Sequence, residues 1–286
     1  MSALPLDSHV HSEWSWDAGE GDLVATCARA VQIGLGALAF TEHVDFTRWS
    51  LVRPGPAEER GSVQDGGFQP EPLDVEGYLA AVDDCRRKFP GLRLLTGVEL
   101  GEPHRHPGKV SAVLSAGPFD RVLGSLHSLP DLDRPGCWVE VGDAYRQRPA
   151  GEVVVAYASG LLDLVAADPP VAVLAHLDYP FRYWPAGAGP LRVEDFEEHL
   201  RAVLSALAGT GRALEVNTRL PLAPVVVDWW HQAGGEAVTF GSDAHRPDRL
   251  AARFAETAEM VAGHGYRPDG HPGGMWRRAR VARGPR

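Results

Sequence analysis

Cysteine is scarce in this chain of 286 residues, which contains only three. Cys27, Cys85 and Cys137 lie far apart, and no two of them have the CxxC spacing. An odd number of cysteines cannot all pair within one chain, so a disulfide framework is not indicated. We therefore expect reduced thiols and no structural zinc site of the cysteine type.

Long apolar runs are also absent from the sequence. The longest, VQIGLGALAF and VVVAYASGLL, are well short of the roughly 20 residues that cross a bilayer as a helix. The first residues, MSALPLDSH, have neither the basic segment nor the apolar core of a secretory signal. These absences predict no membrane partner and, by default, a cytoplasmic location.

Positive charge is in deficit, because 38 acidic residues outnumber 28 basic ones and give a formal net charge of −10. Nucleic acids are bound mainly through clustered Lys and Arg, so a nucleic-acid partner is not expected for most of the chain. The exception is the stretch 267–286, where six Arg stand against one Asp among Gly and Pro. We expect residues 266–286 to form a basic, poorly ordered tail after a single domain of residues 1–265.

Short apolar runs of β-forming residues alternate with segments whose apolar residues recur every three or four positions. Strands that alternate with helices and have apolar centres predict a parallel sheet buried on both sides. Seven such units favour an α/β fold with a seven-stranded, TIM-like (β/α) barrel. The predicted strands are 4–9, 37–42, 92–99, 119–127, 171–176, 212–217 and 237–243. The predicted helices are 21–34, 74–88, 107–116, 150–167, 193–207, 222–234 and 248–263.

Two longer stretches, 53–72 and 129–149, interrupt this order, and each follows a predicted strand. Both read as irregular loops. Loops of this length inside a compact α/β domain are usually functional, and in a barrel they cover the mouth formed by the carboxyl ends of the strands.

Imidazole and carboxylate side chains stand at the carboxyl ends of the predicted strands. In LDSHVHSEW, for example, alternation places Asp7, His9 and His11 on one face. Strand ends of a (β/α) barrel meet at one mouth, so groups distant in sequence become neighbours there. Six of the twelve histidines have this placement, which predicts a site for Zn, Fe or Mn. The set at the strand ends is Asp7, His9, His11, Glu42, His43, Glu99, His127, His176, Asp178, Glu215, Asn217, Asp243 and His245.

The order of these motifs resembles the PHP, or polymerase-and-histidinol-phosphatase, superfamily, over residues 6–245. The matching segments are DSHVH, EH, GVEL, GSLH, AHLD and GSDAH, together with an Asp at position 17. The resemblance implies a distorted seven-stranded (β/α)7 barrel that holds two or three divalent metal ions at its mouth.

The resemblance also implies which residues hold each ion. Glu99 would bridge the first and second ions. Asp17 is the weakest assignment, because many relatives have a His at that position. Asp7, Glu42 and Asp178 would orient ligand imidazoles by accepting their second N–H. The implied ligand sets are His9, His11, Glu99 and Asp243 for the first ion, Glu99, His127 and His176 for the second, and Asp17, His43 and His245 for the third.

Metal ions a few ångströms apart clamp a phosphate and provide hydroxide near neutral pH, so hydrolysis of a phosphate ester is the expected reaction. The sequence has neither a GxSxG elbow nor a P-loop. Glu99, Asp243 and His245 are expected to be catalytic. Arg182 and Arg219, which follow two predicted strands, are expected to bind the substrate phosphate.

Within the superfamily the chain resembles histidinol-phosphate phosphatases, which implies a small phosphate ester, L-histidinol phosphate, as substrate in histidine biosynthesis. One alternative is a PHP phosphoesterase acting on a nucleotide or another phosphorylated metabolite. Another is a metal-dependent binding or regulatory module that uses the Arg-rich tail, although the full set of ligands speaks against it. A polymerase proofreading subunit is disfavoured, and the oligomeric state stays open.

Overall fold

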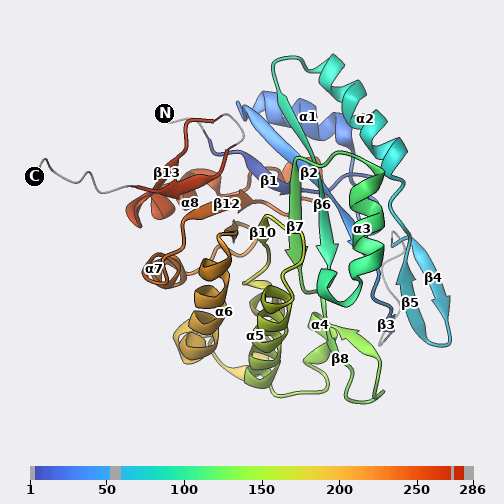
Figure 1. Cartoon of the computed structure of the whole chain (residues 1–286), viewed down its shortest axis with the longest axis vertical. Coiled ribbons are helices and arrows are strands. Elements are labelled where there is room, and N and C mark those ends of the chain that lie inside the picture. The colour runs from blue at the N-terminus through green and yellow to red at the C-terminus, as the bar shows by residue number, and fades with distance from the viewer. Residues whose placement is uncertain (1–3, 52–58, 272–273, 280–286) are drawn as a thin grey trace, which may run out of the picture.

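Seven parallel strands close into a barrel in the computed structural model, which describes residues 4–51, 59–271 and 274–279. The sheet closes where Asp7 of the first strand pairs with Phe240 of the last. The predicted seven-stranded barrel is therefore confirmed (Figure 1). Going around the barrel, the strands are β1 (Asp7–Val10), β2 (Ala37–Asp45), β6 (Arg93–Gly101), β7 (Arg121–Ser125), β10 (Val173–Leu174), β11 (Ala213–Asn217) and β12 (Ala237–Gly241).

The barrel is uneven. β2 and β6 pair in register over nine residues, from Ala37 opposite Arg93 to Asp45 opposite Gly101. By contrast, β10 contributes two residues, and the register between β1 and β2 shifts between Asp7 and Val10. β2 and β6, with nine residues each, are therefore the longest of the seven barrel strands.

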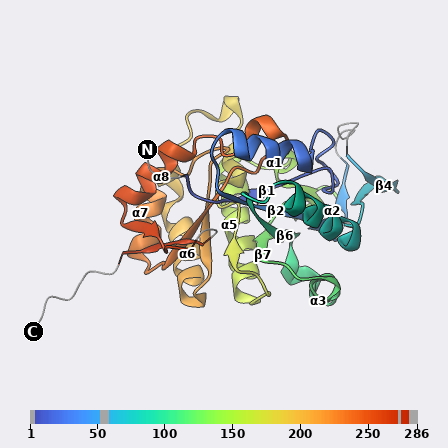
Figure 2. The same ribbon diagram turned by 90° about the horizontal axis from the view of Figure 1, so that it is seen from above.

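Helices surround the strands in both ribbon views (Figures 1 and 2). Asp22 and Asp74 cap the N-termini of two of them. Each aspartate side chain accepts the backbone N–H of the residue three positions later, Ala25 or Gly77, which would otherwise have no partner in the helix. The longer helices are α1 (Leu23–Gln32), α2 (Val75–Lys88), α3 (Pro107–Ala116), α5 (Ala150–Ala166), α6 (Glu197–Thr210), α7 (Pro224–Gln232) and α8 (Phe254–Gly263). Shorter ones are α4 (Val141–Ala144), η1 (Pro103–Arg105), η2 (Tyr179–Tyr183), η3 (Ala186–Ala188), η4 (Val193–Phe196) and η5 (Pro247–Arg249).

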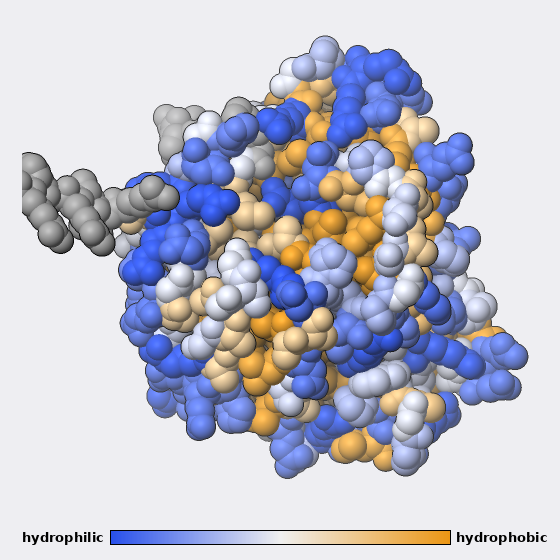
Figure 3. Space-filling view, in the orientation of Figure 1, coloured by the Kyte–Doolittle hydropathy of each residue, from blue (hydrophilic) through white to orange (hydrophobic). Residues whose placement is uncertain are grey.

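Apolar side chains fill the layer between strands and helices. In α6 the buried residues Leu200, Val203, Leu204 and Leu207 recur at the predicted spacing. Figure 3 shows apolar side chains gathered on the surface between α3 and β7. Val110 of α3 belongs to a buried cluster with Val98 and Leu100 of β6. The outer wall of the barrel is therefore apolar, and its polar groups are concentrated at the mouth. No helix among the described residues is long and apolar enough to cross a membrane.

A second, five-stranded sheet stands beside the mouth, and we refer to it as the cap sheet. Its strands, in spatial order, are β4 (Gly61–Gln64), β5 (Gly67–Pro70), β3 (Trp49–Ser50), β9 (Trp138–Glu140) and β8 (Ser128–Pro130). The expectation that 53–72 and 129–149 are irregular is therefore wrong for much of both stretches, although residues 52–58 lie outside the described part. The strands form because Trp16, Trp49 and Phe68 pack into a small core of their own.

The barrel sheet also continues past the predicted domain boundary at residue 265. β14 (Trp276–Arg278) pairs antiparallel with β12, and β13 (Tyr266–Pro268) pairs with β14. Tyr266 is fully buried and the ring of Trp276 contacts Phe240 at 4.9 Å between centroids, so apolar anchors offset the basic composition. Residues 280–286 of the predicted tail lie outside the described residues, and the division into domain and tail stays a prediction.

Candidate metal centre

A pocket of about 740 Å³ opens at the carboxyl ends of the barrel strands, next to the cap sheet. Three of the predicted ligands, His9, His11 and Glu99, are fully buried beneath it. The structure thus brings side chains from positions 9 to 245 together at one end of the barrel. The six predicted ligands that line the pocket are Asp17, His43, His127, His176, Asp243 and His245.

His9 and His11 point to the same side of the chain because residues two apart on a strand share a face. Backbone hydrogen bonds hold this segment to the neighbouring chain end: His11 N–H donates to the carbonyl of Ala244, and Asp243 N–H donates to that of His9. Their Nε2 atoms lie 3.0 Å apart. Both face Glu99 Oε2, at 2.9 and 3.3 Å, and Asp243 Oδ1, at 3.8 and 3.4 Å.

The other oxygen of Glu99 faces a second group of ligands. Glu99 Oε1 lies 3.2 Å from His127 Nε2 and 2.8 Å from His176 Nε2, and it accepts the hydroxyl of Ser125 at 2.5 Å. One carboxylate therefore stands between two groups of imidazoles, with one oxygen toward each. This is the geometry that a bridging ligand needs.

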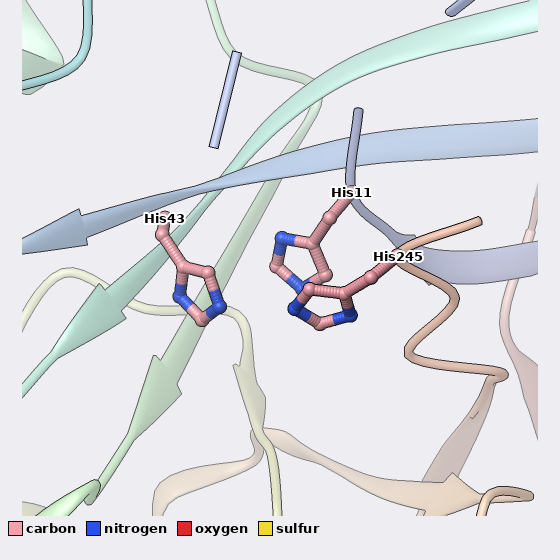
Figure 4. A group of neighbouring side chains, drawn as sticks. All are labelled: His11, His43 and His245. Atoms are coloured by element: carbon pink, nitrogen blue, oxygen red, sulfur yellow. The ribbon is translucent and has the colours of Figure 1, made fainter. Parts of the chain in front are cut away.

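A third group lies nearer to solvent. Asp17 Oδ2 is 3.4 Å from His43 Nε2 and 3.1 Å from His245 Nε2. Figure 4 shows the rings of His43 and His245 gathered around His11, with centroids 4.2 and 4.3 Å from that of His11. The three predicted groups are therefore neighbours within one cluster.

Two of the predicted ligands have left-handed backbone conformations, which residues other than glycine rarely adopt. The φ angles are 62° for His176 and 52° for Asp243. Neighbours hold His176 in place, because its N–H donates to Glu215 and its carbonyl accepts the Tyr157 hydroxyl at 2.7 Å. Backbone strain of this kind is concentrated at functional sites, where the surrounding structure holds the residue in the unfavourable conformation.

Two carboxylates that orient the imidazoles were not assigned this role from the sequence. Glu215 lies 2.5 Å from His9 Nδ1, and Asp45 lies 3.0 Å from His127 Nδ1. A carboxylate accepts here, so each imidazole carries its proton on Nδ1 and directs Nε2 inward. Asp45 stands two residues after His43 on β2, and this period-two spacing is the signal that could have identified it.

The predicted orienting role of Asp7 and Asp178 is not what the structure shows. Asp7 instead accepts the backbone N–H groups of Ser242 and Ala251, both at 3.0 Å, and so ties the chain after β12 to β1. Asp178 accepts the Nε–H of Arg182 at 2.6 Å. Asp178 follows β10 as predicted, whereas Asp7 is the first residue of β1 and does not stand at its carboxyl end. Backbone donors and a guanidinium contact these two acids in place of imidazoles.

Glu42 acts on an imidazole through a serine. It accepts the hydroxyls of Ser12 and Ser15, at 2.6 and 2.5 Å. Because Ser15 gives its one proton to Glu42, its oxygen accepts at the 3.0 Å contact with His11 Nδ1. His11 therefore also carries its proton on Nδ1 and leaves Nε2 available.

The carboxylates shift the pKa values of the histidines beside them. Burial disfavours the protonated form of His9, but the charges of Glu99 and Glu215 outweigh it and raise its pKa well above the ordinary value. The same competition, against Asp45 and Glu99, raises the pKa of His127. For His43 the charges of Asp17 and Glu99 exceed the effect of burial and raise the pKa to about 9.

The two predicted phosphate-binding arginines differ in their surroundings. Arg182 is buried, and its Nη1 donates to Asp243 at 2.5 Å while its Nη2 lies 3.0 Å from His176 Nδ1. Ligation of an ion by His176 Nε2 requires this last contact to be given up, because Nδ1 must then carry the proton. Arg219 lines the pocket, is 57% exposed and lies 3.8 Å from Asp243.

The cluster has the chemistry and the spacing of a metal site. Ligand atoms around one tetrahedral Zn²⁺ lie roughly 3.3 Å apart, given bonds of about 2.0–2.1 Å. The inward atoms described above are separated by 2.8–3.8 Å. Several sets of three such atoms lie within 4.8 Å of one another, including His9, His11 and Glu99. Imidazoles with carboxylates suit Zn, Fe or Mn.

Comparison with known proteins agrees with this geometry. The model of the PHP domain family matches residues 7–219. A histidinol-phosphatase of Lactococcus lactis is 28% identical over 271 residues, with 90% of this chain and 91% of the relative covered. A probable histidinol-phosphatase of Deinococcus radiodurans is 28% identical and covers 91% and 94%.

A solved structure is also similar. It is that of the Lactococcus lactis histidinol phosphate phosphatase, complexed with Zn, L-histidinol and phosphate. It has a TM-score of 0.76 and 26% identity, and the match covers 92% of this chain and 95% of that one.

Proposed function

This chain belongs to the PHP domain family and is a phosphoric monoester hydrolase, and we propose that its substrate is L-histidinol phosphate, which it hydrolyses to L-histidinol. The observation that carries this proposal is the cluster at the barrel mouth, where Glu99 directs one oxygen to each of two imidazole groups. The similar structure from Lactococcus lactis, which contains Zn, L-histidinol and phosphate, supports it.

We assign the nine predicted side chains to two or three divalent ions. When bound, such ions supply Lewis acidity toward a phosphate and a hydroxide nucleophile near neutral pH. Glu99 would bridge two of them, with Asp243 on one side and His176 on the other. Asp17 and His245 would hold the ion nearest to solvent, where the pocket opens. Zn, Fe and Mn all suit this set of ligands.

Arg182 and Arg219 would bind the phosphate oxygens. Both reach Asp243 Oδ2, at 2.5 and 3.8 Å, so they stand at the edge of the ligand cluster. A phosphate carries two negative charges and accepts paired N–H bonds, which a guanidinium supplies in a planar arrangement. Arg219 already lines the pocket. Arg182 would first have to exchange its contact with His176 for one with the substrate.

The alcohol half of the substrate would lie along an aromatic and acidic wall. Tyr179 packs on His127 and His176, with centroids 5.5 and 5.2 Å apart, and Tyr183 packs on Tyr179 at 5.3 Å. Glu140 also lines the pocket. The pKa of Tyr183 is raised, first by its burial and second by the negative charge of Glu140. Histidinol has an ammonium group and an imidazole, which suit a carboxylate beside aromatic rings.

Release of inorganic phosphate from a panel of esters tests the substrate. The panel contains histidinol phosphate, phenyl phosphate, a nucleoside monophosphate and a sugar phosphate. We expect the kcat/KM for histidinol phosphate to exceed the others by at least about a hundredfold, which corresponds to 2.7 kcal/mol of selective binding in the transition state. Equal, slow hydrolysis of all four esters would contradict the proposed substrate but not the reaction.

Glu140→Gln tests the acidic wall separately. We expect kcat/KM for histidinol phosphate to fall about tenfold, mainly through KM, because the ammonium loses its anionic partner. Phenyl phosphate, whose alcohol is uncharged, serves as the matched control and should be hydrolysed at an unchanged rate. A parallel loss on both esters would show that Glu140 supports the fold of the pocket instead.

A second substrate class is favoured by three further arginines that line the pocket. These are Arg246, Arg249 and Arg253, and each pairs with an acidic neighbour. A nucleotide or another metabolite with a second phosphate could use these side chains. In the same panel, preference for a bisphosphorylated ester over histidinol phosphate would support this alternative.

A further inference from the structure

Asp45 lies behind the metal centre and contacts two of its side chains and one side chain of the pocket wall. It is the last residue of β2 and is 5% exposed. Its Oδ1 lies 3.0 Å from His127 Nδ1, and its Oδ2 lies 3.4 Å from His43 Nδ1. The same Oδ2 accepts the indole N–H of Trp16 at 2.8 Å. One buried carboxylate therefore touches two of the proposed ligands and one side chain of the pocket wall.

The neighbouring strand leaves room for this carboxylate. Asp45 pairs with Gly101 of β6. A Cβ atom at position 101 would lie 1.8 Å from Asp45 Oδ1 and 3.2 Å from His127 Nδ1. The backbone at Gly101 is in an ordinary strand, so the glycine is needed for space and not for an unusual φ. The fold thus reserves the volume in which Asp45 meets His127.

Trp16 connects this carboxylate with the cap sheet. Its ring lies 5.7 Å from Trp49, 5.5 Å from Phe68 and 5.9 Å from His43, between centroids. Trp16 and Trp49 both line the pocket. A molecule that presses on the Trp16 ring therefore acts on a side chain whose N–H is bonded to the carboxylate that orients His127.

We propose that Asp45 is a positioning residue that fixes the imidazole of His127 for ion binding, and that Trp16 links the pocket wall to the metal centre through it. The inference rests on the proposed metal centre. It goes beyond that centre because Asp45 is not itself a proposed ligand, and because it joins the ion site of His127 to Trp16 and so to the cap sheet.

Metal affinity tests the proposal without reference to activity. Asp45→Asn and Trp16→Phe are compared with wild type by competition with a chelator for Zn²⁺, and the visible spectrum of the Co²⁺ form reports ligand geometry. Trp49→Phe is the matched control, because it changes an indole of the same wall that packs on Trp16 and leaves Asp45 untouched. Circular dichroism checks that each variant is folded.

Loss of a carboxylate that orients a ligand histidine commonly costs 10- to 100-fold in metal affinity, and we expect about this loss for Asp45→Asn, with an altered Co²⁺ spectrum. Trp16→Phe should lose about threefold, and Trp49→Phe should bind as wild type does. In steady-state kinetics at saturating metal, Asp45→Asn should lower kcat and leave KM nearly unchanged.

Wild-type affinity and an unchanged Co²⁺ spectrum in Asp45→Asn would overturn the proposal. If Asp45→Asn does not fold, Trp16→Phe decides, because it removes one donor and leaves the carboxylate in place. An effect of Trp49→Phe equal to that of Trp16→Phe would remove the link to the pocket wall. Failure of the wild type to bind any divalent ion would instead refute the proposed metal centre.

Discussion

The barrel mouth and the cap sheet face the same pocket but are built in different ways. At the mouth, buried His9, His11 and Glu99 stand on or directly after parallel barrel strands, β1 with four residues and β6 with nine, and a carboxylate lies behind His9. The cap sheet has strands of two to four residues and a core of three aromatic side chains. The cap thus has a small aromatic core of its own, although Leu129 of β8 and Val139 of β9 also pack into the main core.

We infer that the barrel mouth holds the ions for the reaction and that the cap sheet contributes to substrate recognition. Side chains that must hold ions to within fractions of an ångström stand on the rigid barrel. Trp49 of the cap sheet lines the pocket and belongs to an aromatic cluster beside it, whereas Trp16 of the same cluster is bonded to Asp45 behind the mouth. Substitutions at the mouth should therefore act on metal binding and kcat, and substitutions in the cap should act mainly on KM.

The largest effect is expected at Glu99. Glu99→Gln removes a charge that two ion sites share, so kcat should fall about a thousandfold or more and at least one ion per chain should be lost. Phosphate release and metal analysis by mass spectrometry measure the two effects. Glu198→Gln, on the exposed face of α6, is the matched control and should behave as wild type does. Near-normal turnover of Glu99→Gln would place the chemistry elsewhere.

A smaller loss is expected one layer behind the ligands. Glu215→Gln keeps the size of the side chain but no longer offers an anionic acceptor to His9 Nδ1, which it contacts at 2.5 Å. We expect metal affinity or kcat to fall about 10- to 100-fold, with KM little changed. Chelator competition and initial rates measure this. A change confined to KM would mean that Glu215 acts on the substrate and not on the mouth.

The metal affinity of the mouth should depend on pH. In the metal-free protein the pKa of His43 is about 9, so this imidazole is protonated at neutral pH and must lose its proton to bind an ion. Affinity should therefore rise as pH rises from 7 toward 9, by about tenfold per pH unit for each proton released. Calorimetry of metal binding in buffers of different ionisation enthalpy counts the protons. An affinity that is flat over this range would contradict the assignment of His43 as a ligand.

The smallest effect on catalysis is expected in the cap sheet. Phe68 is 5% exposed and packs on Trp16 and Trp49, but it does not line the pocket. Phe68→Ala should lower the free energy of unfolding of this region by about 3 kcal/mol. KM should rise a few-fold while metal affinity stays as in wild type. Hydrogen exchange and metal titration report on both regions, and a loss of bound metal would show that cap and mouth are not independent.

The sequence allowed more to be predicted about the mouth than about the cap. The mouth could be predicted because strands of a parallel barrel all end on one side, so a His or Asp at each strand end implies one cluster. The cap sheet could not, because its strands pair across the chain: Trp49 lies opposite Trp138, and neither short run has a periodic pattern. Gly and Pro in 53–72 and 129–149 also mask its strands.

Within the mouth, ligand positions were easier to predict than the groups that orient them. Asp7 is the first residue of β1 and accepts backbone N–H groups, whereas Asp45 and Glu215 contact the imidazoles. Which acid faces which imidazole depends on strand register and on rotamers, and neither follows from the spacing of residues along one strand. The strands β13 and β14 were hidden in a similar way, because Arg and Gly around Tyr266 and Trp276 resemble a solvated tail.

Metal titration of the stripped enzyme tests the central claim most directly. The protein is freed of metal with a chelator, and hydrolysis of histidinol phosphate is followed as Zn²⁺ or Mn²⁺ is added. We expect no phosphate release without metal and a rate that reaches its plateau at two or three ions per chain. Full activity of the metal-free protein, or a folded chain that takes up no divalent ion, would contradict it.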